Sequence, residues 1–384
     1  MSTRFSRRSA ALLSLLMLGL LVGCDKDKDV EPPAELVNFK SSLTVDRAWN
    51  VSVGGGESVL RLGLAPAVDG ATVYVAGRKG EVLALQADTG KVLWRTRIAG
   101  AISGGPGAGL GLVLVGTSNG EVVAFDQQSG EQRWRVKVGG EVLSAPAVAA
   151  DAVIVRTVAG RLLGLSRDSG AELWREEQQI PRLTLRGAAA PVVAGSTAVC
   201  GFDNGRVVAV ETRNGEVLWD QLVAAPRGRT ELERLVDIDA TVKVSGLDVF
   251  VAGFQGRVAM LALDSGQSWW SREISSHRGL DVDDESVYVS TASGEVIALR
   301  RRSGVELWRQ DGLRLRGLSA PVASGSYVAV ADFEGYVHWL DAASGAFVAR
   351  IKAGGRVSNA PIKAGELVIV QDDEGRVTAF RPRV

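Results

Sequence analysis

The chain has 384 residues, of which 46% are hydrophobic and 23% are charged, a composition typical of a soluble globular core. Its 44 basic and 44 acidic side chains give a formal net charge of zero, which argues against a general nucleic-acid binder, because such proteins carry a basic footprint. The 46 glycines predict frequent turns, and the length suits one large all-β domain as well as two or three average ones.

The first 23 residues have the pattern of a bacterial signal peptide. Basic residues at Arg4, Arg7 and Arg8 precede an apolar run over residues 10–23, which is too short to cross a bilayer. The run ends at Cys24 in the sequence Leu-Val-Gly-Cys, which resembles the lipobox of bacterial lipoproteins. In a lipobox the cysteine becomes the lipidated N-terminus, carrying palmitate among its lipids. The alternative is an ordinary secretory signal that happens to contain a cysteine.

Residues 24–46 are predicted to form a lipidated, flexible tether. Alternating aspartates and lysines are followed by Glu-Pro-Pro, and neither stretch offers apolar side chains for packing. We therefore expect a lipoprotein of the bacterial envelope. Asp25, directly after the lipidated position, resembles an inner-membrane retention signal of enteric bacteria, so sorting between the two membranes stays open.

A repeat organises the remaining chain around regularly spaced turn glycines. Each glycine lies between two β-favourable runs, and pairs such as Asn119-Gly120 are typical of tight hairpins, because Asn and Gly tolerate a positive φ. A strand-opening position, often proline, lies 14 residues before each glycine. The glycines are Gly80, Gly120, Gly160, Gly205, Gly256, Gly294, Gly335 and Gly375.

A tryptophan follows six of these glycines at a spacing of 14 residues, and the seventh repeat has Ala349 there instead. A second turn lies between glycine and tryptophan, so each unit is predicted to contain four short antiparallel strands. Such a sheet cannot bury both faces alone, and the units must therefore stack around a ring. The tryptophans are Trp94, Trp134, Trp174, Trp219, Trp270 and Trp308.

The eighth unit ends before its tryptophan, and residues 47–53, which include Trp49, match the missing strand. Pairing the two ends of the chain in one blade would remove open sheet edges. We predict an all-β, eight-bladed β-propeller over residues 47–384, with the N-terminal strand completing the last blade. The repeats resemble the Ala-x-Asp-x-x-Thr-Gly-x-x-x-Trp motif of quinoprotein-like (PQQ-type) propellers, in which the tryptophan docks between neighbouring blades.

This resemblance raises the alternative of a quinone-cofactor dehydrogenase. Many such enzymes carry a vicinal disulfide and a calcium site, whereas Cys24 and Cys200 lie far apart here. His277 and His338 belong to no metal-spaced cluster, and Cys200 is predicted to be a buried, inert strand residue. We predict that the chain is not an enzyme and that it has no catalytic residue, cofactor or metal. A glycan- or peptidoglycan-binding propeller is the further alternative.

Two consecutive inter-blade connections are long. The spacing from the tryptophan to the next strand-opening position is 17 residues after Trp174 and 23 residues after Trp219. Connections between blades emerge on one face of a propeller, so these two should lie side by side, and long loops on a rigid scaffold commonly carry function. Their leucines alternate with arginines and acids, which is typical of a protein-binding hot spot and includes Arg234 as a candidate. The alternative is that the leucines fold inward while the charges pair with one another.

Residues 183–187, 203–207, 231–239 and 334–339 resemble the BamB family, lipoprotein subunits of the outer-membrane β-barrel assembly (BAM) machinery. In that family the Leu-x-Leu-Arg and Asp-x-Asp loops contact the periplasmic POTRA domains of BamA. The resemblance implies a non-catalytic scaffold that is anchored at the periplasmic face of the outer membrane. Unfolded outer-membrane proteins, whose strands could add to a blade edge, are the second class of partner. It implicates Leu183, Leu185, Arg186, Asp237 and Asp239 in partner binding.

Overall fold

The computed structural model describes residues 31–54, 63–185, 187 and 189–383. The predicted signal peptide, Cys24 and Arg186 lie outside the described residues. Contacts divide the chain into residues 1–33 and residues 34–384, and the second unit contains all of the assigned strands. No helix in the described ranges is both long enough and apolar enough to span a membrane.

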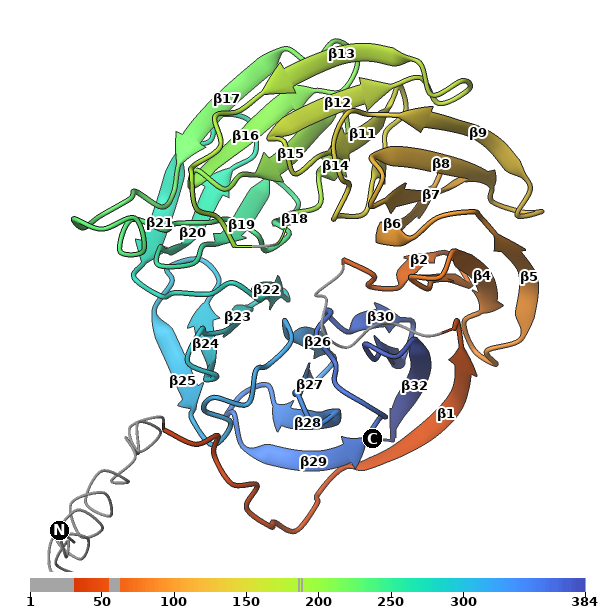
Figure 1. Cartoon of the computed structure of the whole chain (residues 1–384). Coiled ribbons are helices and arrows are strands. Elements are labelled where there is room, and N and C mark those ends of the chain that lie inside the picture. Colours follow the sequence, from red (N-terminus) through yellow and green to blue (C-terminus); the bar gives the residue numbers. More distant parts are fainter. Residues whose placement is uncertain (1–30, 55–62, 186, 188, 384) are drawn as a thin grey trace, which may run out of the picture. The chain divides into compact units, whose positions relative to one another are not determined.

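The described residues of the second unit form eight four-stranded antiparallel sheets, arranged as blades around a ring (Figure 1). This confirms the predicted fold. Blades 1 to 4 consist of β2 (Ala67–Asp69), β3 (Thr72–Ala76), β4 (Glu81–Gln86) and β5 (Val92–Arg97); β6 (Ile102–Gly109), β7 (Leu112–Thr117), β8 (Glu121–Asp126) and β9 (Gln132–Lys137); β10 (Ala147–Val148), β11 (Val153–Arg156), β12 (Arg161–Leu165) and β13 (Glu172–Glu177); and β14 (Val192–Ala194), β15 (Thr197–Gly201), β16 (Arg206–Glu211) and β17 (Val217–Leu222).

Blades 5 to 8 repeat this arrangement, and the last takes one strand from each end of the propeller sequence. They consist of β18 (Lys243–Ser245), β19 (Asp248–Ala252), β20 (Val258–Ala262) and β21 (Ser268–Arg272); β22 (Gly279–Val282), β23 (Ser286–Ser290), β24 (Val296–Arg300) and β25 (Glu306–Gln310); β26 (Val322–Ser324), β27 (Tyr327–Ala331), β28 (Tyr336–Asp341) and β29 (Phe347–Lys352); and β30 (Ile362–Ala364), β31 (Leu367–Gln371), β32 (Arg376–Arg383) and β1 (Thr44–Ser52).

The two middle strands of each blade carry the core. In blade 1, β3 and β4 are apolar at almost every position, because neighbouring blades cover both faces of the sheet. The outermost strand, β5, keeps alternate residues exposed. The turn between β3 and β4 needs Gly80, whose φ is 92° and where a Cβ would lie 2.3 Å from the carbonyl oxygen of Ile98.

The predicted docking of tryptophans between blades is confirmed. Trp94 donates its indole N–H to the carbonyl of Gln127 in the next blade at 3.0 Å, and a Cβ on Gly130 would lie 2.6 Å from the Trp94 ring. A glycine in the outer turn is therefore what makes room for the ring. The same bond recurs from Trp49 to Ala87, Trp134 to Arg167, Trp174 to Thr212, Trp219 to Leu263, Trp270 to Arg301 and Trp308 to Ala342.

Ring closure follows the prediction, since β1 pairs antiparallel with β32 from Thr44 opposite Arg383 to Ser52 opposite Arg376. It also explains Ala349, the one missing tryptophan. In blade 8 the two outer strands come from distant parts of the sequence, so they are not joined by the glycine turn on which a tryptophan docks. Ala349 packs in a cluster with Leu43 and other residues of blades 7 and 8 instead.

Residues 34–43, which we call the N-terminal strap, lie against blades 6 and 7 (Figure 1). Ala34 N–H donates to the carbonyl of Arg314 at 2.9 Å, and Leu43 N–H donates to that of Val348 at 3.1 Å. Phe39 stacks on Phe347 with ring centroids 5.6 Å apart. The sequence predicts that this segment belongs to the flexible tether and that the propeller begins at residue 47, whereas the structure docks the segment on the ring and begins β1 at Thr44. Its apolar side chains, interspersed with charges, account for the docking.

Candidate functional site

Two long loops form the candidate site. The first long loop is residues 178–191, between β13 and β14, and the second long loop is residues 223–242, between β17 and β18. Leu185 N–H donates to the Asp237 carboxylate at 3.0 Å, which joins the two loops. The prediction that they lie side by side on one face of the ring is therefore confirmed.

The projecting part of the second long loop is a single helical turn with its own cap. Thr230 Oγ1 accepts the N–H of Glu233 at 3.2 Å, while the Glu233 carboxylate accepts the N–H of Thr230 at 3.0 Å. This reciprocal arrangement is a capping box, which satisfies amide groups that the turn leaves unpaired. Arg234 N–H completes the turn on the carbonyl of Thr230 at 3.0 Å. The loop tip thus has a defined conformation.

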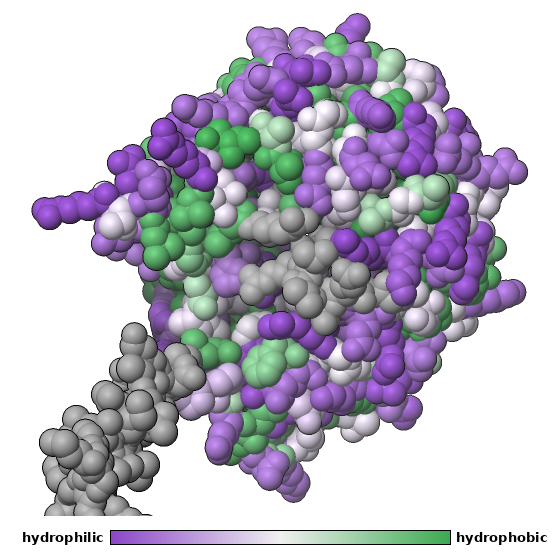
Figure 2. All heavy atoms as spheres, viewed as in Figure 1, coloured by the Kyte–Doolittle hydropathy of each residue, from purple (hydrophilic) through white to green (hydrophobic). Residues whose placement is uncertain are grey.

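Apolar side chains on both loops are exposed. Leu183 is 42% exposed, Ile180 39% and Leu232 67%, and the side chain of Arg234 is exposed as well. Figure 2 shows hydrophobic residues gathered on this side of the ring, beside the hydrophilic tip of the projecting loop. Leu232 was not singled out from the sequence, although its position between two glutamates in a long loop was a usable signal.

The two aspartates of the second long loop point inward. Asp237 is fully buried and Asp239 is half-buried, and both lie within 4.8 Å of the Asp203 carboxylate. Burial raises the pKa of Asp237, and the neighbouring carboxylates of Asp239 and Asp203 raise it further. Burial also raises the pKa of Asp239, against the pull of the Arg156 guanidinium. Asp237 therefore acts within the loops and presents no surface of its own.

The chemistry of this cluster is that of an ion network. Among the described residues, Asp203, Asp237 and Asp239 are the group close enough to share a metal ion, but Arg156 forms an ion pair with Asp203 and already supplies positive charge. Cys200 lies in the same region, fully buried, and burial raises the pKa of its thiol to about 12. A thiol with that pKa is not a nucleophile at neutral pH, and its predicted burial in a strand is confirmed.

A cavity of about 650 Å³ opens beside the loops toward the centre of the ring. Leu185 and Asp239 line it together with small residues of the innermost strands, such as Ala67 and Pro146. Leu185 is half-buried, so it closes the wall of this cavity while Leu183 faces outward. Of the two alternatives that the sequence left open, Leu183 therefore fits the outward-facing one and Leu185 the inward-facing one.

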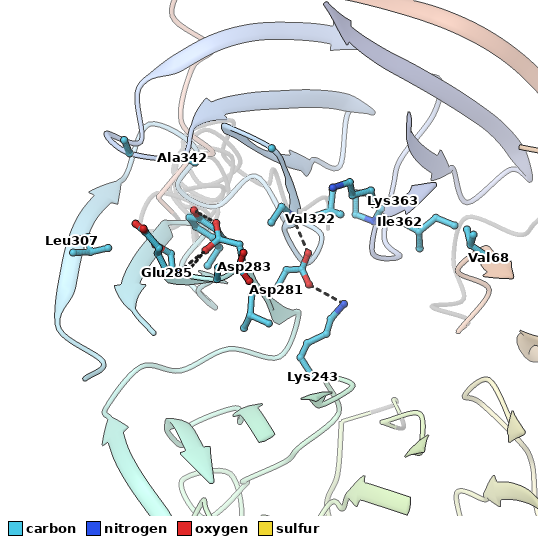
Figure 3. Close-up of a pocket in the computed structure, with 18 residues that line it drawn as sticks. Val68, Lys243, Asp281, Asp283, Glu285, Leu307, Val322, Ala342, Ile362 and Lys363 are labelled. Carbon is cyan, nitrogen blue, oxygen red and sulfur yellow. Dashed lines mark hydrogen bonds and ion pairs between the residues drawn. The ribbon is translucent and has the colours of Figure 1, made fainter. Parts of the chain in front are cut away.

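A larger cavity, of about 1130 Å³, lies away from the loops (Figure 3). It is lined by the turns between the first and second strands of blades 6 and 7, which lie at the opposite end of the strands from the inter-blade connections. Lys243 pairs with Asp281 at 3.1 Å, Asp281 also accepts the N–H of Ala323 at 2.9 Å, and Tyr288 donates to Asp283 at 2.8 Å. Its wall is therefore partly occupied by structural contacts.

Of the predicted partner-binding residues, the structure places Leu183 and Arg234 on the surface, Leu185 and Asp239 half-buried, and Asp237 in the interior. It joins Leu185 directly to Asp237. Arg186 lies outside the described residues. The sequence pattern did not separate the residues that face solvent from those that hold the loops in place.

Comparison with known proteins gives consistent matches. The family model described as outer membrane protein assembly factor BamB matches residues 41–107, 99–310 and 294–383. A protein of that name from Pseudomonas aeruginosa is 52% identical over 380 residues, which cover 98% of this chain and 99% of the relative. Its namesake from Escherichia coli is 37% identical over 384 residues, covering 96% and 98%.

Solved structures agree with the fold. The crystal structure of BamB from Moraxella catarrhalis is similar with a TM-score of 0.80 and 29% identity, covering 88% of this chain and all of that one. A quinohemoprotein alcohol dehydrogenase from Comamonas testosteroni matches with a TM-score of 0.67 at 12% identity, covering 88% of this chain and 76% of that chain, a likeness of fold alone.

Proposed function

This chain belongs to the family of the outer membrane protein assembly factor BamB, and from that membership we propose that it acts in outer-membrane protein assembly as a non-catalytic scaffold. In this proposal the two long loops bind the POTRA domains of BamA within the BAM complex. The propeller positions the loops, and the loops bind the partner.

The observation that carries the proposal is the pair of exposed leucines, Leu183 and Leu232, on two loops joined by the bond from Leu185 to Asp237. Exposed apolar anchors bordered by charge are the usual energetic centre of a protein interface. Arg234 supplies charge beside Leu232. Since the capping box and the bond between loops fix the backbone, little conformational entropy is lost on binding.

The residues divide into two roles in this interface. Leu183, Leu232 and Arg234 contact the partner, because their side chains are exposed. Asp237 and Asp239 are positioning residues, because they are buried against the backbone of the first loop. Arg186 is included as a contact on the family pattern alone. Strands of unfolded outer-membrane proteins, adding to outer blade edges, are a second class of partner in the proposal.

We also propose that residues 1–23 are removed and that Cys24 carries the lipid, which anchors the chain at the periplasmic face of the outer membrane. Asp25 makes the choice of membrane the point to test. The Cys24→Ala variant should leave the membrane fraction, and separation of inner from outer membranes of cells that express the unaltered chain locates the anchor.

The interface is tested by measuring the affinity of the purified chain for the BamA POTRA domains by titration calorimetry. Leu183→Asp with Leu232→Asp should weaken binding by about a thousandfold, since two hot-spot residues contribute about 2 kcal/mol each. Leu93→Asp is the matched control, because Leu93 is 53% exposed on the outer strand of blade 1. Unchanged affinity in the double variant would remove the loops from the interface.

A further inference from the structure

Comparison of equivalent positions in the eight blades shows an unusual residue in blade 3. Arg156 ends β11, four residues before the turn glycine, and the same position in the other blades is occupied by a small residue in all but one case. A long cation thus replaces a small side chain in the packed interior. The equivalent residues are Ala76, Gly116, Gly201, Ala252, Ser290, Ala331 and Gln371.

Arg156 is surrounded by groups from blades 3 and 4 and the second long loop. Its side chain is 1% exposed, it forms an ion pair with Asp203 of the blade 4 turn, and its guanidinium lies 5.1 Å from the ring centroid of Phe202. It also attracts the carboxylates of Asp239 and Asp237. A buried cation is tolerated only where acids compensate it, and here the acids come from the elements that carry the candidate interface.

The two aspartates of the second long loop in turn contact the backbone of the first long loop. Asp237 accepts the N–H of Leu185 at 3.0 Å, and its own carbonyl accepts the N–H of Phe254 at 2.7 Å. At Gly187 a Cβ would lie 2.4 Å from the Asp239 carboxylate, so the first loop packs directly on that acid. The contacts therefore run from the cation through the acids to the segment that carries Leu183.

We propose that Arg156 is a positioning residue of the loop interface, which keeps the two aspartates of the second long loop in the arrangement that holds the first. The proposal rests on the proposed function, since it deepens the description of the same surface. Arg156 itself touches no partner, because its side chain is buried. Without its charge, Asp203, Asp237 and Asp239 would lose the cation that compensates them, and Asp237 would no longer be held where it accepts the amide of Leu185.

The test uses the full purified chain and two measurements, hydrogen–deuterium exchange of residues 182–190 and affinity for the POTRA domains. Arg156→Ala should raise the exchange of this segment and weaken binding, each by about tenfold or more. The Arg156→Ala/Asp203→Asn double variant removes the unpaired charge in the blade 4 turn, so its melting temperature should recover while exchange and binding stay altered. Arg156→Lys keeps the charge and should retain most of both.

The matched control is Gln371→Ala, which changes the other large residue at this position of the repeat. Gln371 donates to the carbonyl of Ala76 at 2.9 Å at the junction of blades 8 and 1, so its loss should lower stability without altering the exchange of residues 182–190. Wild-type exchange and affinity in the double variant would overturn the proposal and leave Arg156 a purely structural role. If the unaltered chain fails to bind the POTRA domains, the proposed function falls, while exchange still tests Arg156.

Discussion

Two buried ion clusters on the ring are built differently. The loop cluster consists of Arg156, Asp203, Asp237 and Asp239, and it supports the candidate interface. The strap cluster consists of Arg316, Asp332, Glu334, His338 and Arg350 in blades 6 and 7, and it holds the N-terminal strap. Both place cations against buried carboxylates, although Glu334 at the edge of the strap cluster is exposed, and they differ in how completely their buried polar atoms are paired.

In the strap cluster each group has directed partners. Arg316 donates from Nε to Asp332 at 2.8 Å and from Nη1 to the carbonyl of Ala34 at 3.0 Å, and it pairs with Glu334. Arg350 donates to His338 Nδ1 at 3.2 Å, so the other ring nitrogen, 3.1 Å from Asp332, carries the proton and donates it. Burial lowers the pKa of His338, which favours this neutral form.

In the loop cluster several buried atoms have no hydrogen-bond partner among the described residues: Nε and Nη1 of Arg156, Oδ1 of Asp237 and Oδ1 of Asp239. A fully paired network fixes one arrangement, whereas buried polar atoms without a partner cost stability. The strap cluster is therefore the more stabilising of the two, and the loop cluster leaves buried polar atoms without a partner beside the loops of the proposed interface.

The largest effect should come from breaking the fully paired cluster. Arg316→Ala leaves Asp332 buried without its cation, and the loss of one partner from a buried pair costs about 3–5 kcal/mol in the free energy of unfolding. Urea denaturation measures it, with Arg302→Ala, an exposed arginine of blade 6, as the control. A loss below about 1 kcal/mol, as for a surface pair, would show that the strap cluster is not the stronger of the two.

The two clusters also show which features of the molecule could be predicted from the sequence and which could not. Blade number, ring closure and tryptophan docking followed from spacing, because glycine turns and tryptophans impose the same geometry wherever they recur. The orientation of Asp237 did not follow, since an Asp-x-Asp loop has the same pattern whether its acids face water or a buried arginine. Arg156 was visible only as a departure from its own repeat, and the docking of Phe39 depended on a surface of blade 7 that no local pattern describes.

A smaller effect is expected from titration of the loop cluster. Since the pKa of Asp237 is raised on folding, the folded state binds the carboxyl proton more tightly than the unfolded chain does. The contribution of this proton to the free energy of unfolding is therefore complete only under acidic conditions. It falls as pH rises from about 4 and is lost as pH passes the raised pKa. Wild-type protein should therefore lose stability between pH 5 and 9 relative to Asp237→Asn, by roughly 1–3 kcal/mol.

Urea midpoints at several pH values measure this difference. Asp151→Asn, which removes a carboxylate from an exposed turn of blade 3, controls for the change in net charge. Parallel pH profiles for wild type and Asp237→Asn would show that the loop cluster is as well compensated as the strap cluster, and the contrast between them would disappear.

The smallest effect concerns the strap itself. Phe39 stacks on Phe347, and the Arg350 guanidinium lies 5.1 Å from the Phe39 ring centroid, so Phe39→Ala removes one aromatic and one cation–π contact, worth about 1 kcal/mol together. Cleavage within residues 34–43 by a protease should become faster, whereas Val37→Ala, at a side chain 75% exposed, should leave it unchanged.

Because the strap fixes residues 34–43 to the ring, its release lengthens the chain between the proposed lipid on Cys24 and the first fixed residue. Faster cleavage with unaltered global stability would identify the strap as a separately released segment, and equal cleavage in both variants would mean that the backbone bonds to Arg314 and Val348 hold it without the ring contacts.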